Sequence, residues 1–327
     1  MFVLTANVTL GGFKPIKPHS LKWKRSIDDY SDTAVITVPA ITMLKTTGDQ
    51  YKKVDTGLQL VEGMKVMIEA GYNGNNVKRF EGFIRRRNFS VPLEIECEGY
   101  SYQLRKKVGY NKSYPTNTKL KVLLNDLIQG TDIKLSALIP DITIESPVWF
   151  KNVSRIQVLD WIKDNMLLSA YFNYNELFVG LREQELKGEV KLRLGWNTIK
   201  DNALKFNSER EYADVRIQLG KRNKDGSMNM TDDSAVNTTG VKIFKIGVRL
   251  SAYWNEQIRA SLKKHLLNVG YEGTITTFLI PFAEPGMKAT IDDPRYQERK
   301  GSYFIESVDG ELSPSGGRQK IKIGNVL

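Results

Sequence analysis

The residue types that carry most nucleophilic and metal chemistry are scarce in this chain of 327 residues. Cys97 is its only cysteine, and its only histidines, His19 and His265, lie in unrelated sequence contexts. An internal disulfide is therefore impossible, and Cys-rich or His-rich metal sites and Ser-His-Asp triads are poorly supplied. Cys97 alternates with glutamates in a strand-like segment, which predicts a buried, unreactive thiol. His265 falls on the apolar stripe of a predicted helix and is interpreted as a structural side chain.

Neighbouring carboxylates offer no acid–base pair either. Asp232-Asp233 and Asp292-Asp293 are adjacent in predicted loops, where two neighbouring side chains do not face one another across the bond of a substrate. Asp225-Gly226 and Asp309-Gly310 predict turns, because the further ligands of a calcium loop are missing at alternate positions. The sequence contains no GxSxG, HExxH, GxGxxG or phosphate-loop motif. We therefore predict no catalytic, cofactor or metal site, and a protein that binds and assembles.

The net charge of +11, from 48 Lys and Arg against 37 Asp and Glu, favours an anionic partner such as nucleic acid. The most basic run, Arg85-Arg86-Arg87, however, lies in a predicted strand that folds back on residues 93–99. Cross-strand pairs of opposite charge contribute about 0.2 to 1 kcal/mol each. We interpret the run as one side of an ion ladder rather than as a nucleic-acid patch. The predicted pairs are Arg87 with Glu94 and Arg85 with Glu96.

Composition is that of a globular chain with material for about two domains. Hydrophobic residues make up 41% and charged residues 26%. No run of about 18 apolar residues is present, which predicts no membrane span. The segment Met1–Thr5 lacks the basic start and apolar middle of a signal peptide, so we expect the chain to stay in the cytoplasm where it is made.

The elements that must position these residues are mainly strands, and one set of strands is repeated. Residues 286–292 (GMKATID) match residues 63–69 (GMKVMIE) in the Gly-Met-Lys start, the Ile and the final acid. In each copy a polar loop follows, then an aromatic-Ile strand, Phe83-Ile84 or Phe304-Ile305, then a turn and an alternating last strand. This order of elements predicts two copies of one small barrel.

The predicted fold is mainly β with an α+β insertion: two similar tube-type antiparallel β-barrels, a small α+β domain, and a helix before the last barrel. Residues 1–110 form the first barrel, which residues 186–220 complete. Residues 111–185 form the insertion, where apolar residues from Leu120 to Ile128 follow a helical period. Residues 221–327 form the second barrel, with a helix over 252–267. Residues 45–56 are polar and predict a loop.

Several motifs resemble those of bacteriophage tail hub proteins, which are related to the hub part of contractile-injection and type VI secretion spike proteins. Their C-terminal barrel is similar to four segments: 270–278 (GYEGTITTF), 285–287 (PGM), 301–308 (GSYFIESV) and 317–324 (GRQKIKIG). The matching part of their first barrel is similar to 80–84 (FEGFI) and 95–100 (IECEGY). The resemblance covers nearly the whole chain, with the insertion and residues 221–240 matching only in outline.

The resemblance implies a structural protein of the baseplate or tail tip of a phage or prophage, not an enzyme. Such hubs are homotrimers in which two barrels per chain make a pseudo-sixfold ring. The ring adapts a hexameric tail tube to a threefold tip and encloses a channel for transient DNA passage. The partners implied are the tail tube or a distal tail protein, and a separate spike or fibre protein, because no spike segment follows Leu327. The expected location is the virion tail, assembled in the cytoplasm of a host bacterium.

In such a trimer, one strand is a candidate for the contact between subunits. The segment Thr274–Phe282 carries apolar groups on both faces, which is typical of a strand buried on two sides, one of them against a neighbouring chain. The candidate interface residues are Ile275, Phe278, Leu279 and Ile280.

Two alternatives stay open. A nucleic-acid-binding protein built on small β-barrels would use the net charge and the aromatic residues, and it predicts tight, salt-sensitive binding to single strands. A cell-wall hydrolase carried on a tail lacks any acid–base pair that the sequence identifies.

Overall fold

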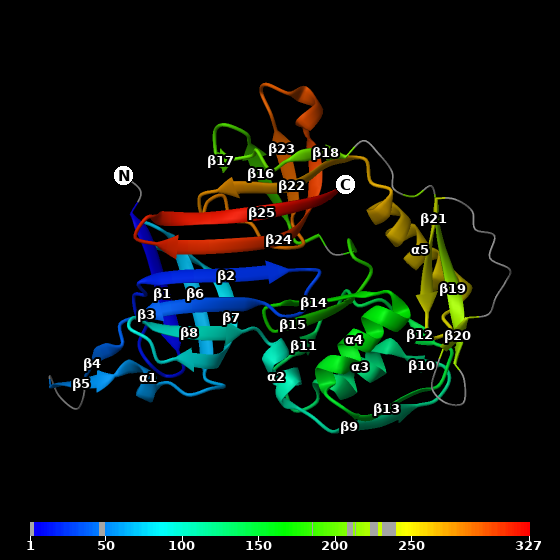
Figure 1. Cartoon of the computed structure of the whole chain (residues 1–327), viewed down its shortest axis with the longest axis horizontal. Coiled ribbons are helices and arrows are strands. Elements are labelled where there is room, and N and C mark those ends of the chain that lie inside the picture. Colours follow the sequence, from blue (N-terminus) through cyan, green and yellow to red (C-terminus); the bar gives the residue numbers. More distant parts are fainter. Residues whose placement is uncertain are drawn as a thin grey trace.

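The computed structural model describes residues 3–45, 50–184, 186–207, 212, 214–222, 228–230 and 240–327. The described chain is mainly β, with its longer helices on the right in Figure 1 and a single helical turn at residues 56–59 on the left. It is built from two β-units that share one 13-stranded sheet and from an α+β region beside them. The prediction of a mainly β fold with helices is confirmed.

The N-terminal β-unit contains six strands in the order β1-β6-β7-β8-β3-β2, all antiparallel to their neighbours. Apolar and polar residues alternate along them, so each strand turns one face to a shared core, as in Ile36 and Ile95, which are fully buried. The strands are β1 (Leu4–Leu10), β2 (Ser20–Ser26), β3 (Thr33–Val38), β6 (Lys65–Tyr72), β7 (Asn75–Asn88) and β8 (Leu93–Glu98).

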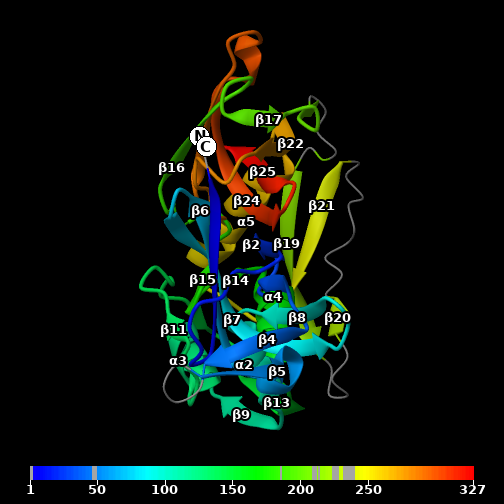
Figure 2. The same cartoon turned by 90° about the vertical axis from the view of Figure 1, so that its left-hand side faces the viewer.

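A hairpin projects from this unit between β3 and β6. Its strands, β4 (Ile41–Lys45) and β5 (Tyr51–Asp55), extend away from the molecule at the lower left of Figure 1 and lie in front of it in Figure 2, and the short helix α1 (Thr56–Gln59) follows them. Of the loop predicted over 45–56, residues 51–55 are therefore a strand, and residues 46–49 lie outside the described residues. The hairpin holds its place by pairing within itself, and it leaves Ile41 and Met43 of β4 exposed.

The C-terminal β-unit lies above the first in Figure 1 and has its own core, which includes Ile275, Ile305 and Ile321. Its central order is β23-β24-β25-β22; β16 lies parallel to β23, and β17 and β18 lie in succession along β22. The strands are β16 (Glu189–Arg193), β17 (Thr198–Lys200), β18 (Lys205–Asn207), β22 (Gly270–Thr277), β23 (Lys288–Asp292), β24 (Gly301–Ser313) and β25 (Gly316–Val326), and the 3₁₀ turn η1 (Gln297–Arg299) precedes β24.

The two units are joined edge to edge. Strand β2 pairs antiparallel with the second half of β24, so that Lys24 lies opposite Asp309 and Ser26 opposite Ser307. The first half of β24 pairs with β23 on that same side. Within the described strands, β2 does not pair with β1, so the N-terminal β-unit is an open barrel whose sheet continues into its neighbour.

The α+β region buries a third core, formed by residues such as Leu123, Leu159 and Phe172. Helix α4 begins after Ser154, whose backbone N–H donates to Gln157 Oε1 at 2.8 Å. The helices are α2 (Ser101–Lys106), α3 (Leu120–Ile128), α4 (Arg155–Met166) and α5 (Ala252–Leu266). The strands are β9 (Tyr110–Tyr114), β10 (Thr118–Lys119), β11 (Lys134–Leu135), β12 (Thr143–Ile144), β13 (Val148–Val153), β14 (Ser169–Asn173), β15 (Glu176–Gly180), β19 (Asp214–Arg222), β20 (Met228–Met230) and β21 (Val241–Ile246).

Two predicted boundaries are corrected by the strand pairing. Residues 186–220 do not complete the first unit: β16, β17 and β18 pair with β23 and β22 of the second. The helix predicted over 252–267 is present as α5. It was assigned to the second barrel, but Ile258 of that helix and Leu250 before it are buried in the core of the α+β region, so α5 belongs to that region. Both errors have one cause, because a strand or helix pattern does not specify its distant partner.

Candidate assembly surface

The start of β6 is fixed by a glycine turn. Gly63 has φ +82°, a left-handed conformation that side chains other than glycine rarely adopt. Its N–H donates to the carbonyl oxygen of Ile84 at 2.8 Å, and the N–H of Ile84 donates to the carbonyl oxygen of Met64 at 2.9 Å. The turn thereby sets the register between β6 and β7.

The start of β23 has the same geometry. Gly286 has φ +88°. Its N–H donates to the carbonyl oxygen of Ile305 at 2.9 Å, and the N–H of Ile305 donates to the carbonyl oxygen of Met287 at 2.9 Å. The sequence repeat is thus a repeat of backbone structure, in which Gly-Met and the later Ile have the same roles in both copies.

The two copies also share an irregularity in the strand pairing. The pairing of β7 with β8 shifts between Ile84 and Arg86, and that of β24 with β25 shifts between Ile305 and Ser307. A bulge bends a strand and increases its twist, so it is a specific structural feature. Its presence at the equivalent position in both copies supports a common origin of the two units. Strands β6, β7, β8 and β3 therefore correspond to β23, β24, β25 and β22.

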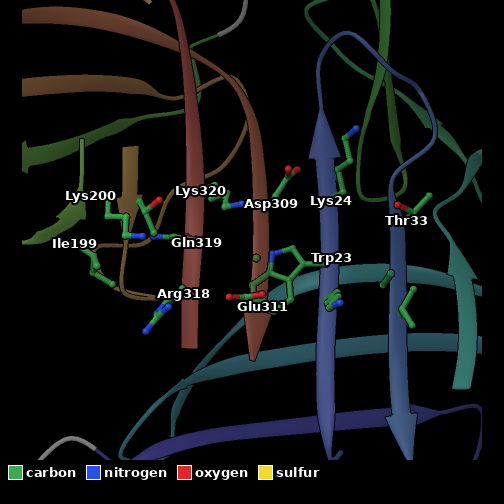
Figure 3. Close-up of a pocket in the computed structure, with 15 residues that line it drawn as sticks. Trp23, Lys24, Thr33, Ile199, Lys200, Asp309, Glu311, Arg318, Gln319 and Lys320 are labelled. Atoms are coloured by element: carbon green, nitrogen blue, oxygen red, sulfur yellow. The ribbon is translucent and has the colours of Figure 1, made fainter. Parts of the chain in front are cut away.

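One face of the shared sheet is polar and hollowed, and we call it the polar sheet face (Figure 3). A cavity of about 550 Å³ lies over strands from both units. Its polar and charged lining residues are Lys22, Lys24, Thr33, Lys200, Thr276, Asp309, Glu311, Arg318, Gln319 and Lys320. The cavity spans the junction of β2 with β24, so it exists only because the two units are joined.

Charges of opposite sign alternate across this face. Glu311 of β24 lies opposite Lys22 of β2 on one side and Arg318 of β25 on the other. Asp309 likewise lies between Lys24 and Lys320 in the strand register. Opposed charges across strands stabilise the pairing. The face is consequently a mixed-charge surface with a basic excess, not a uniformly positive groove.

The ion ladder predicted on β7 and β8 is present with different partners. The bulge after Ile84 shifts the register, so that Arg86 lies opposite Glu96 and their side chains meet at 2.5 Å. The bond from Arg86 lowers the pKa of Glu96. The predicted pairs of Arg87 with Glu94 and Arg85 with Glu96 were therefore wrong.

The other two arginines of the run have different contacts. The Arg85 guanidinium lies 4.0 Å from Glu98 Oε2. Arg87 donates to the backbone carbonyl oxygens of Gly57 and Leu60.

The predicted interface segment divides between interior and surface. Ile275 is in the core of the C-terminal β-unit, and Leu279 is in the core of the N-terminal β-unit, both fully buried. Phe278 and Ile280, by contrast, are 51% and 45% exposed. The interior pair cannot contact another chain, so only Phe278 and Ile280 stay candidates for an interface.

A buried polar cluster, which the sequence did not reveal, ties the three parts of the chain together. Arg25 of β2 lies 3.2 Å from both Asp32 Oδ2 and Glu284 Oε1, and it donates to Asn173 Oδ1 at 3.3 Å. Tyr174 donates to Glu284 Oε1 at 2.6 Å. Burial outweighs the pairing with Arg25 and raises the pKa of Asp32 to about 6. One signal in the sequence could have indicated that Arg25 is buried: it follows Leu21 and Trp23 at every second position of β2, on the face that points inward.

A second buried arginine bridges the two β-units. Arg79 of β7 is 2% exposed, and its guanidinium donates to the carbonyl oxygens of Leu279 at 2.6 Å and Ala70 at 3.3 Å. It also donates to Gln319 Oε1 of β25 at 3.4 Å. Its hydrogen-bond partners are neutral, and burial lowers the pKa of Arg79 to about 10.

Chemistry-bearing residues are otherwise not assembled in the described part of the chain. Cys97 is buried, and burial raises the pKa of its thiol. No group of three or more His, Cys, Asp or Glu side chains is arranged to hold a metal ion among the residues described. No described helix is long and apolar enough to cross a membrane.

No protein-family model and no curated protein match the sequence. Solved structures do match in fold. A tail protein from Neisseria meningitidis matches with a TM-score of 0.64 and 13% identity, covering 99% of this chain and 97% of that one. The 43 kDa tail protein of prophage MuSo2 from Shewanella oneidensis matches with a TM-score of 0.62 and 12% identity, covering 98% and 97%.

An E. coli type VI secretion component, c3393, matches with a TM-score of 0.58 and 9% identity, covering 98% of this chain and 77% of that one. That protein is itself described as similar to the T4 bacteriophage tail proteins gp27 and gp5. The resemblance to phage tail proteins predicted from the motifs is confirmed at the level of the fold, and it extends over nearly the whole chain.

Proposed function

We propose that this chain is a structural hub protein in the tail of a phage or phage-like particle. The observation that carries the proposal is the internal duplication, which repeats a glycine turn, its hydrogen bonds and a bulge in two units of one chain. The fold that solved phage tail proteins share with this chain supports placing it in a phage tail.

Duplication provides a way to match two symmetries. A homotrimer of a chain with two similar units presents six similar units around one axis while the chain itself obeys threefold symmetry. Such a ring can contact a hexameric tail tube or distal tail protein on one side. On the other side it can contact a threefold tip made of a separate spike or fibre protein. The expected location is the virion tail.

The polar sheet face is the surface that we assign to the DNA channel of this ring. It carries Lys22, Lys24, Lys200, Arg318 and Lys320. Asp309 and Glu311 lie among these cations in the strand register. A mixed-charge lining attracts the phosphate backbone weakly, so DNA would pass without being retained. No enzymatic step is part of this function.

The oligomeric state tests the proposal. We expect light scattering to give a particle mass three times that of the chain at micromolar concentration. Electron microscopy should show a ring with six similar lobes around a channel. A monomer throughout the concentration series, or a ring without six lobes, would overturn the hub function.

Nucleic-acid binding is the competing function, and the net charge of +11 is the observation in its favour. Filter binding with single-stranded DNA at rising salt separates the two. A hub retains little DNA at physiological salt, whereas a dedicated binding protein retains it with high affinity and a steep salt dependence.

A further inference from the structure

We propose that strand β18 of one copy of this chain adds antiparallel to the free edge of β7 in the next copy. In the proposed register Lys205 lies opposite Asn88, Phe206 opposite Arg87, and Asn207 opposite Arg86. The inference rests on the trimer proposed above and specifies its contact. It comes from the way in which the chain joins its own two units.

The internal join provides the template. Strand β2 is the last strand of the N-terminal β-unit, and its outer edge pairs with the second half of β24. In that pairing Lys24 lies opposite Asp309, Arg25 opposite Val308 and Ser26 opposite Ser307. A second join of the same kind needs a strand equivalent to β2 and an edge equivalent to that of β24.

The strand equivalent to β2 is the interrupted pair β17 and β18. Ile36 of β3 pairs with Ile95 of β8, and Ile275 of β22 pairs with Ile321 of β25, so that Ile275 corresponds to Ile36. Three residues earlier on each strand, Glu272 of β22 corresponds to Thr33 of β3. Lys24 pairs with Thr33, and Lys205 pairs with Glu272. Lys205 of β18 is thus the counterpart of Lys24.

The edge equivalent to that of β24 lies at the end of β7. Because Ile84 corresponds to Ile305 and both strands carry the same bulge, Asn88 corresponds to Asp309. The pairing of β7 with β6 ends at Phe83. Beyond it, residues 86–88 pair only with β8 among the described strands. No described strand therefore takes, against β7, the position that β2 occupies against β24; the segment 57–60 contacts this end of β7 through the Arg87 side chain.

Both edges expose large apolar side chains. Phe206 is 54% exposed on β18. Phe89 and Val91, directly after β7, are 65% and 91% exposed. An unpaired edge with exposed apolar groups is a liability unless another strand covers it. A second copy would cover both edges at once, since each copy contributes one edge of each kind.

The charges are compatible with this register. Lys205 would lie opposite the neutral Asn88, whose side chain donates to Glu94 at 3.0 Å within its own chain. Arg87 would lie opposite an aromatic ring, and Arg86, opposite Asn207, keeps its bond to Glu96. No two like charges face one another, which favours the pairing.

A disulfide between copies tests the register. The double variant Asn88→Cys/Lys205→Cys should form cross-linked dimers and trimers under mild oxidation. The internal counterpart Lys24→Cys/Asp309→Cys calibrates the geometry, because it should form an intrachain bond of the same kind. The variant Asn88→Cys/Phe206→Cys is the register control. Moving one residue along a strand turns the thiol to the other face, so it should not cross-link.

The outcomes separate this inference from the hub function. Trimers that form without the Asn88–Lys205 cross-link, while the internal pair does form, would overturn the strand addition and leave the hub standing. A chain that stays monomeric in all variants and in the wild type would remove the hub function as well.

A substitution on β18 provides a second measurement, with urea unfolding to check the monomer fold, because the Phe206 ring also packs edge-to-face on Tyr271 of its own chain. Phe206→Lys places a cation opposite Arg87 and should raise the concentration at which half of the chains are trimeric by about tenfold. Val122→Lys is the matched control, because Val122 is an exposed residue of α3, in the α+β region. Equal trimer stability in the two variants would contradict the proposed contact.

Discussion

At the scale of single residues, the notable feature of the described chain is a set of buried charged side chains, not a set of reactive groups. Arg25 and Asp32 are 4% and 5% exposed and are paired at 3.2 Å. Removing ions from water is costly, so such a cluster persists only when its hydrogen bonds are largely satisfied. Here the partners come from the N-terminal β-unit, from the α+β region and, through Glu284, from the C-terminal β-unit. The cluster favours one relative arrangement of these parts over others.

The raised pKa of Asp32 predicts a specific pH dependence. Its pKa of about 6 in the folded chain exceeds its ordinary value of 3.8. Between about pH 4 and pH 6 the folded chain therefore holds a proton that the unfolded chain has released, and this group stabilises the fold as the pH falls. We expect the free energy of unfolding of the wild type, minus that of Asp32→Asn, to rise by up to about 3 kcal/mol from pH 7 to pH 4.

Urea unfolding at a series of pH values measures this difference. Asp164→Asn, at an exposed position on α4, controls for the loss of one carboxylate. A difference for Asp32→Asn that stays flat, or that falls towards acid pH, would contradict the assignment.

At the scale of elements, the junction of β2 with β24 depends on a glycine, Gly310, which has no side chain. Gly310 of β24 lies opposite Trp23 of β2, and a Cβ at Gly310 would lie 2.0 Å from the indole ring. The ring therefore occupies the space that a side chain would need. Close packing of this kind is intolerant of added atoms, because neighbouring strands cannot move apart without losing hydrogen bonds.

Gly310→Ala should destabilise the junction. Overpacking typically costs about 1 to 3 kcal/mol, and the displaced tryptophan should change the intrinsic fluorescence of the folded chain. Gly12→Ala is the control, since a Cβ there meets nothing within 4 Å. Urea unfolding followed by fluorescence measures both variants, and equal stability of the two would refute the packing argument.

At the scale of the whole molecule, the two β-units are not independent bodies. Leu279, which follows β22 of the C-terminal β-unit, is fully buried in the core of the N-terminal one. Arg79 holds the carbonyl oxygen of that residue from the other side of the junction. Together with the continuous sheet, these contacts predict that the units unfold in one cooperative transition.

Arg79→Met removes the bridging guanidinium and leaves buried acceptors without a donor. We expect a loss of about 2 to 4 kcal/mol in the free energy of unfolding. Denaturant curves from fluorescence and circular dichroism should separate if the units then unfold in turn. Arg318→Met, an exposed arginine on the polar sheet face, should stay within about 0.5 kcal/mol of the wild type. A comparable loss at both positions would show that the bridge has no special role.

The sequence by itself determined the local elements and the duplication. Alternation along segments such as Met287–Asp292 fixes which face of a strand is apolar, and the repeated Gly-Met-Lys specifies the same turn twice. Helices α3, α4 and α5 lie where a helical period and end signals indicate them. These features depend on neighbours within a few residues, so a local pattern is sufficient to encode them.

Only the tertiary structure decided which strands meet. β16 joins β23, β2 joins β24, and the bulge after Ile84 moves Arg86 opposite Glu96 in place of the pairs predicted. The buried partners of Arg25 likewise come from segments far apart in the chain. Backbone hydrogen bonds between strands are the same for every residue type except proline. The choice among possible partners therefore follows from how all the apolar faces pack at once, and no single segment contains that information.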